Sequence, residues 1–84
     1  MLPDIDALEA SLLNTSGTVT LDVRFRTLFT LKGIAALSEE KRLRVIDIIS
    51  RALNDDSALL KHELAYVLGQ IKDTRALPRL EQVL

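Results

Sequence analysis

A strongly helical stretch of the chain covers residues 59–71, with the sequence Leu59-Leu60-Lys61-His62-Glu63-Leu64-Ala65-Tyr66-Val67-Leu68-Gly69-Gln70-Ile71. Its large aliphatic residues recur every three or four positions and so fall on one side of an α-helix: Leu60, Leu64, Val67, Leu68 and Ile71. His62, the only histidine of the chain, falls nearly opposite that side and is followed by Glu63. The stretch therefore predicts an amphipathic helix that carries an imidazole and a carboxylate away from its apolar side.

Helical spacing of apolar residues continues along almost the whole chain, and no alternating run of β-branched residues indicates a strand. Asp4 and Ser38 indicate helix starts, because their side-chain oxygens can accept hydrogen bonds from the unpaired N–H groups of a first turn. Gly33 is placed to supply a left-handed residue at the end of the second helix. The sequence predicts one all-α domain over residues 1–84, with helices at about 4–13, 21–32, 38–53, 57–71 and 74–84.

The predicted helices repeat along the chain. A shift of 37 residues aligns similar side chains: Phe29 with Tyr66, Leu31 with Leu68 and Ile34 with Ile71. A shift of 31 residues aligns two further pairs: Ile46 with Leu77 and Leu53 with Leu84. Helix pairs that recur at such a period are typical of an α-solenoid, in which each pair buries its apolar face against its neighbours. We expect about two helix pairs after an N-terminal helix.

The number of predicted repeats is small for such an array, which usually needs three or more. Leu84 also falls on an apolar position of the last predicted helix. We therefore expect the chain to be a fragment of a longer array. Its uncovered C-terminal face would favour a homodimer, the commonest closed assembly, through four apolar residues: Leu77, Leu80, Val83 and Leu84.

Composition and charge exclude several classes of function. Eleven basic residues stand against twelve acidic ones, so the chain lacks the positive charge that binds nucleic acid or an anionic membrane. There is no cysteine, which excludes disulfides and thiolate metal sites. No apolar run approaches the roughly 20 residues that span a bilayer, and the first residues lack the pattern of a signal peptide. A cytoplasmic protein that binds neither nucleic acid nor membrane is expected.

The candidate chemistry lies at His62 and Glu63. Imidazole and carboxylate together are ligands of zinc and of non-haem iron, but one histidine cannot hold a metal alone. The pair is not a zinc peptidase motif, since Tyr66 stands where the second histidine of that motif is required. It is therefore either an ordinary pair on a helix surface or part of a site with members outside these residues. Asp55 and Asp56 are interpreted as a helix start rather than as metal ligands.

Residues 55–70, from Asp55-Asp56-Ser57 through His62-Glu63 to Gly69-Gln70, resemble the first His-Glu repeat of the deoxyhypusine hydroxylase family. Residues 24–33 are similar to the N-terminal repeat of that family, and residues 73–78 to the start of its following helix. The resemblance implies an all-α, HEAT-like helical-repeat α-solenoid. In the parent enzyme, two halves of the solenoid would face each other across a di-iron centre that hydroxylates deoxyhypusine on a translation factor.

The resemblance also implies roles for two residues. His62 corresponds to a ligand of Fe(II), and Glu63 corresponds to a catalytic-site carboxylate that engages the cationic substrate side chain. Only one of the family's four His-Glu pairs falls within this sequence, so we expect the fragment to be inactive and to bind no iron by itself. The alternative is a non-enzymatic HEAT-like scaffold that binds protein, with His62 and Glu63 as a surface pair.

Overall fold

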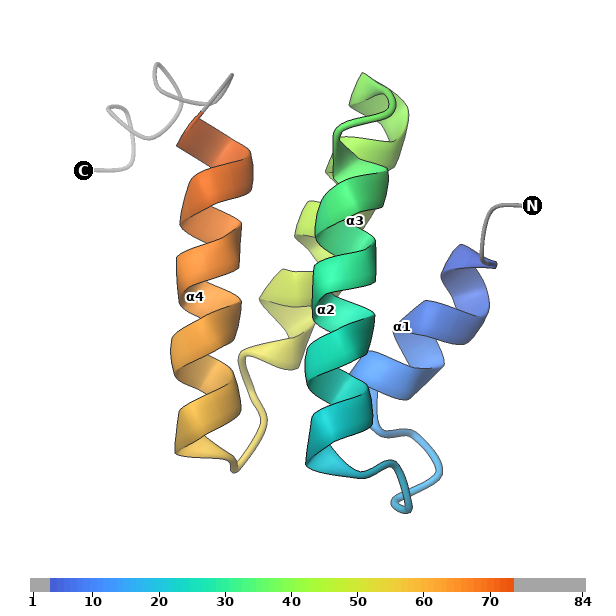
Figure 1. Cartoon of the computed structure of the whole chain (residues 1–84), viewed down its shortest axis with the longest axis vertical. Coiled ribbons are helices and arrows are strands. Elements are labelled where there is room, and N and C mark those ends of the chain that lie inside the picture. The colour runs from blue at the N-terminus through green and yellow to red at the C-terminus, as the bar shows by residue number, and fades with distance from the viewer. Residues whose placement is uncertain (1–3, 74–84) are drawn as a thin grey trace.

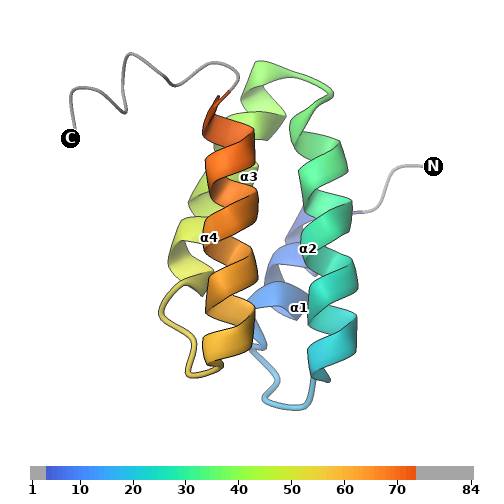
Figure 2. The ribbon, with the colours of Figure 1, turned by 60° about the vertical axis from the view of Figure 1, so that its left-hand side comes forward.

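The computed structural model describes residues 4–73, which form four α-helices: α1 (Ile5–Leu13), α2 (Leu21–Ala35), α3 (Glu39–Ala52) and α4 (Ala58–Asp73). The helices make two layers, with α2 beside α4 in one layer and α1 beside α3 in the other (Figures 1 and 2). The two helices of each layer run in the same direction, because each short connection reverses the chain (Figure 1). Residues 4–73 contain no strand, so the predicted all-α class is confirmed. None of the described helices is long and apolar enough to cross a membrane.

The core lies between the two layers and receives aliphatic side chains from all four helices. Because successive helix positions differ by about 100°, residues three and four apart reach the same side and meet their counterparts on the facing helix. Nine of these side chains are fully buried: Leu12, Leu28, Leu31, Val45, Ile48, Ile49, Leu60, Leu64 and Val67. The predicted apolar side of the fourth helix is therefore the side that packs.

The helix starts follow the predicted capping residues. The Asp4 carboxylate accepts a hydrogen bond from the Asp6 N–H at 3.0 Å, and Ser38 Oγ accepts one from the Lys41 N–H at 3.1 Å. Each bond pairs an N–H group that has no partner within the helix. After α1, Asn14 adopts a left-handed conformation with φ 56°, and the chain turns toward α2.

The predicted end of the second helix at Lys32 is wrong. Helix α2 continues through Gly33 to Ala35, and its C-cap residue Ala36 is right-handed, with φ −81°. Ile34 and Ala35 are 4% and 2% exposed. Burying them offsets the cost of about 1 kcal/mol for a glycine inside a helix. Helix α4 also extends two residues beyond its predicted end, to Asp73.

The predicted helix 74–84 and the predicted dimer face lie outside the described residues. Both stay predictions.

Gly33→Ala is expected to stabilise the chain by about 0.5 to 1 kcal/mol, because alanine loses less backbone entropy in a helix. A Cβ at this position meets no atom within 4 Å, so the methyl group fits. The matched control is Gly17→Ala, which should destabilise by about 1 kcal/mol because Gly17 has φ +79°. Urea denaturation of the three proteins measures both effects. Destabilisation by Gly33→Ala would show that α2 ends at the glycine after all.

Candidate functional site

The predicted site residues lie on the face of α4 that points away from the core. His62 is exposed and Glu63 is half-buried, whereas Leu60 and Leu64 on the opposite side are fully buried. Among residues 4–73, neither the His62 imidazole nor the Glu63 carboxylate forms a hydrogen bond or an ion pair with another side chain. Both groups therefore keep their capacity to bind a ligand.

The next turn of α4 continues this outer face. Tyr66 is 60% exposed and its hydroxyl accepts a hydrogen bond from the Gln70 side-chain amide at 3.2 Å. Gly69 is exposed, and a Cβ there would meet nothing within 4 Å, so the surface is low and open at this point. A ligand or a partner helix can thus come close to the backbone of α4 one turn after His62.

The equivalent face of α2 has different chemistry. Phe25 occupies the repeat position of His62 and is half-buried, and Phe29 occupies that of Tyr66 and is 52% exposed. The repeat fold itself therefore does not require an imidazole on this face, which makes His62 a local addition of α4.

His62 and Glu63 have donor atoms of the right type for a metal ion, but too few of them. Neutral imidazole and carboxylate are both ligands of non-haem iron, so the types fit. The number does not fit, because residues 4–73 contain no group of three or more histidine, cysteine, aspartate or glutamate side chains able to hold a metal ion. The described chain can supply part of a metal site and not a complete one.

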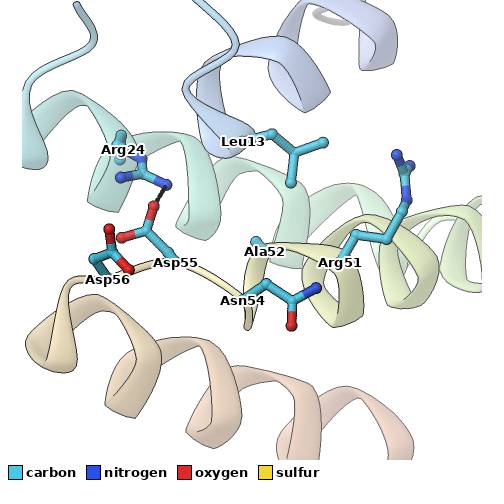
Figure 3. A pocket seen from close by; sticks show the side chains of 7 residues that line it. All are labelled: Leu13, Arg24, Arg51, Ala52, Asn54, Asp55 and Asp56. Atoms are coloured by element: carbon cyan, nitrogen blue, oxygen red, sulfur yellow. Dashed lines mark hydrogen bonds and ion pairs between the residues drawn. The ribbon is translucent and has the colours of Figure 1, made fainter. Parts of the chain in front are cut away.

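A buried arginine lies beneath the start of α4 and was not identified from the sequence. Arg24 is only 5% exposed, and its guanidinium donates two hydrogen bonds to the Leu12 carbonyl, from Nε at 2.9 Å and from Nη2 at 2.6 Å. The same Nη2 donates to Asp55 Oδ2 at 2.6 Å, and the two side chains point toward each other in Figure 3. Arg24 thereby joins the end of α1 to the connection between α3 and α4.

The Asp55 carboxylate also prepares the start of α4. Its second oxygen accepts a hydrogen bond from the Ser57 N–H at 2.8 Å. The Arg24 guanidinium, followed by this backbone N–H, lowers the pKa of the Asp55 carboxyl below its ordinary value of 3.8. The interpretation of Asp55 as part of a helix start is therefore confirmed, although the arginine partner was not foreseen.

The same residues border a pocket of about 260 Å³ (Figure 3). Arg24 is held there by Asp55, and Arg51 forms ion pairs with Glu9 and Asp47. Both cations are already neutralised by carboxylates, so the pocket offers no unpaired positive group for an anion. Its lining is Leu13, Arg24, Arg51, Ala52, Asn54, Asp55 and Asp56.

The lowered pKa of Asp55 predicts an acid-sensitive contribution to stability. A carboxyl group with a lowered folded-state pKa stabilises the fold fully above its unfolded pKa, and this stabilisation is lost as pH falls through the folded-state pKa. The unfolding free energies of the wild type and Asp55→Asn should therefore differ most near neutral pH, begin to converge below about pH 4, and meet only below the lowered pKa of Asp55. Urea denaturation between roughly pH 2 and pH 7 measures the difference.

The matched control for this pH series is Asp56→Asn, which removes a neighbouring exposed carboxylate without an ion pair among residues 4–73. It should follow the wild-type profile. Parallel profiles for the wild type and Asp55→Asn over the whole range would contradict the coupling of Asp55 to Arg24.

Comparison with known proteins identifies close relatives. Residues 60–84 match the family of PBS lyase HEAT-like repeats. The sequence is 61% identical to the deoxyhypusine hydroxylase of Mycosarcoma maydis over 80 residues, which make up 95% of this chain and 22% of that protein. It is 57% identical to the deoxyhypusine hydroxylase of Cryptococcus neoformans, and the match covers 92% of this chain and 20% of that protein. It is 47% identical to the human deoxyhypusine hydroxylase, and the match covers 96% of this chain and 24% of that protein. No solved structure matches the chain.

The matches cover almost all of this chain but only part of each relative. The chain spans about a fifth to a quarter of the length of these relatives, whereas the relatives align with almost all of its own residues. The match to HEAT-like repeats agrees with the paired helices of the structure, and so the predicted helical-repeat class is confirmed. By sequence, this chain belongs to the deoxyhypusine hydroxylase family.

Proposed function

We propose that this chain supplies one His-Glu pair to a di-iron deoxyhypusine hydroxylase that acts on a translation factor in the cytoplasm. The observation that carries the proposal is the outward face of α4, where the His62 imidazole and the Glu63 carboxylate have no partner among residues 4–73. The names of the relatives support the same assignment.

The two residues would have separate roles. Neighbouring residues of a helix point about 100° apart, so His62 and Glu63 do not converge on one ion. We assign the His62 imidazole to iron, because neutral imidazole is a good ligand for Fe(II). We assign Glu63 to the protonated amines of deoxyhypusine, because a carboxylate accepts strong charge-assisted hydrogen bonds from a cation. The iron, when bound, would supply the activation of dioxygen.

The activity is tested in a longer protein of this family that contains these residues. After loading with Fe(II), it is mixed with the deoxyhypusine form of the translation factor under air. The expected result is a product that is heavier by one oxygen atom, detected by mass spectrometry. An iron-loaded protein that leaves the substrate unchanged would overturn the assignment.

The chain alone is expected to bind no stoichiometric iron, because three or so protein ligands are the usual minimum for a non-haem iron site. The measurement is metal analysis of the purified 84-residue chain after anaerobic incubation with Fe(II) and gel filtration. One tightly bound iron per monomeric chain would contradict the prediction. It would mean that the 84-residue chain offers ligands beyond His62 and Glu63.

A non-enzymatic scaffold is the second candidate, and one observation favours it. Phe29 and Tyr66 are large, exposed aromatic residues at equivalent positions of the adjacent helices α2 and α4. Exposed aromatic side chains are enriched at protein interfaces. The scaffold reading requires that partner binding survive His62→Ala and fall after Tyr66→Ala. The enzyme reading requires that His62→Ala remove the activity.

A further inference from the structure

The start of α4 is tied to α2 and α1 by the buried ion pair of Arg24 and Asp55. We propose that this ion pair is a positioning device for the His62-Glu63 segment, and the inference rests on the proposed function of that segment.

A continuous series of bonds leads from Arg24 to the turn before His62. Arg24 Nη2 donates to Asp55 Oδ2 at 2.6 Å, and Asp55 Oδ1 accepts from the Ser57 N–H at 2.8 Å. Ser57 Oγ then accepts from the Leu60 N–H at 3.2 Å, and the Ser57 carbonyl accepts from the Lys61 N–H at 2.9 Å. Every link lies within the first turn of α4 or directly before it.

Burial makes this series geometrically restrictive. The Arg24 side chain is 6% exposed and the Asp55 side chain 20% exposed, so water cannot readily replace either partner. Two further hydrogen bonds to the Leu12 carbonyl hold the guanidinium plane in one orientation. Buried ion pairs contribute little net stability but can select one arrangement among several. Here the selected arrangement is the position of the α4 start relative to α1 and α2.

The start of α2 offers an internal comparison. Thr20 occupies the repeat position of Ser57, and its side chain makes no capping hydrogen bond. Thr18, at the repeat position of Asp55, has no carboxylate that could pair with an arginine. The ion pair of Arg24 and Asp55 is therefore not a general requirement of a helix pair in this fold. It belongs to the one described helix that carries an imidazole on its outer face.

The segment of α4 between the ion pair of Arg24 and Asp55 and the proposed ligand His62 is short and stiff. His62 follows Ser57 by five residues, which is about one and a half helical turns. A helix of this length does not bend easily, so a shift at Ser57 displaces the His62 side chain with it. Metal ligands must be held within about 0.5 Å of their working positions. A loose start of α4 would therefore weaken metal retention before the fold is lost.

The first test uses the 84-residue chain and needs no metal. Amide hydrogen exchange is measured for Leu60 and Lys61 relative to Val67 in the middle of α4. Asp55→Ala should raise the exchange ratio of the first turn at least tenfold. Asp55→Asn keeps one acceptor oxygen for the Ser57 N–H but places an amide NH2 group, which cannot accept a hydrogen bond, against Arg24. Its first turn should therefore exchange faster than in the wild type and more slowly than in Asp55→Ala.

Arg51→Ala is the matched control for exchange, because Arg51 also borders the pocket of Figure 3 but pairs with Glu9 and Asp47. It should leave the first turn of α4 unchanged relative to Val67. An equal rise at Leu60, Lys61 and Val67 in Asp55→Ala would overturn the proposal, because the pair would then act only on global stability.

The second test measures iron retention in a longer protein that contains these residues. Asp55→Ala should lower the retained iron at least tenfold compared with Val45→Ala, a core variant that destabilises the fold away from the α4 start. Equal iron in both variants would overturn the positioning role. A wild-type protein that retains no iron would instead overturn the proposed function, and the exchange experiment would still decide whether the pair positions α4.

Discussion

His62→Ala should abolish iron retention in a longer protein of this family that contains these residues. Loss of a group that merely supports a metal ligand lowers metal affinity by about 10- to 100-fold, so loss of the ligand itself should have a larger effect. The fold should survive, because His62 is exposed and makes no side-chain bond among residues 4–73. The measurement is iron content per chain after gel filtration, together with circular dichroism to verify the helix content.

Glu63→Ala tests whether Glu63 has a role separate from that of His62. If Glu63 engages the substrate cation, this variant should keep its iron and raise the KM for the translation factor. Tyr66→Phe, one turn further along the same face, removes only a hydroxyl and controls for changes of the surface. Equal loss of iron in His62→Ala and Glu63→Ala would show that the two residues do not have separate roles. Full iron retention in His62→Ala would remove His62 from the metal site.

The orientation of α4 could be predicted because its pattern contains only one apolar side. Leu60, Leu64 and Val67 are fully buried, and His62 lies away from them as their spacing indicates. Ser38 could be predicted as a capping residue in the same way, because a serine before two acidic residues is typical of a helix start. In both cases the decisive interaction lies within one or two turns of the chain.

The end of α2 could not be predicted from the same local signals. A glycine after Lys32 is a common helix terminator, yet the helix passes through Gly33 because Ile34 and Ala35 find cover in the core. The burial of these residues depends on neighbouring helices. A glycine inside a helix costs about 1 kcal/mol, and here the burial of Ile34 and Ala35 outweighs that cost.

The ion pair of Arg24 and Asp55 was missed for a different reason. The partners are 31 residues apart, and charged residues are usually assigned to the surface. One signal was available in the sequence. Arg24 lies four residues before Leu28 and seven before Leu31, on the side of α2 that is buried. A charged residue on an apolar stripe should have been expected to have a partner from another helix or connection.

The remaining members of the proposed metal site are not found among residues 4–73. The geometry of residues 4–73 accounts for how one imidazole is held outward on a rigid helix. Other ligands would have to come from further repeats that face this surface, since residues 4–73 contain no cluster of three candidate ligands. The repeat architecture is suited to this division, because each repeat packs only against its neighbours and can carry its own ligand pair on its outer face.

Leu64→Ala should destabilise the chain by about 2 to 5 kcal/mol, because it removes buried methyl groups and leaves a cavity between the layers. Leu64 is fully buried and lies two residues after His62, on the opposite side of α4. A small domain has a total stability of roughly 5 to 15 kcal/mol, so this loss would take a large share of it. Urea denaturation followed by circular dichroism measures the change.

Leu59→Ala is the matched control in the same helix, because Leu59 is 59% exposed. The same chemical change there should alter the free energy of unfolding by no more than about 0.5 kcal/mol. The difference between the two leucines reports which side of α4 packs, and therefore which side carries His62 outward. If Leu59→Ala were the more damaging change, α4 would be rotated about its axis and His62 would lie toward the core, where it could not contribute to a site shared with other repeats.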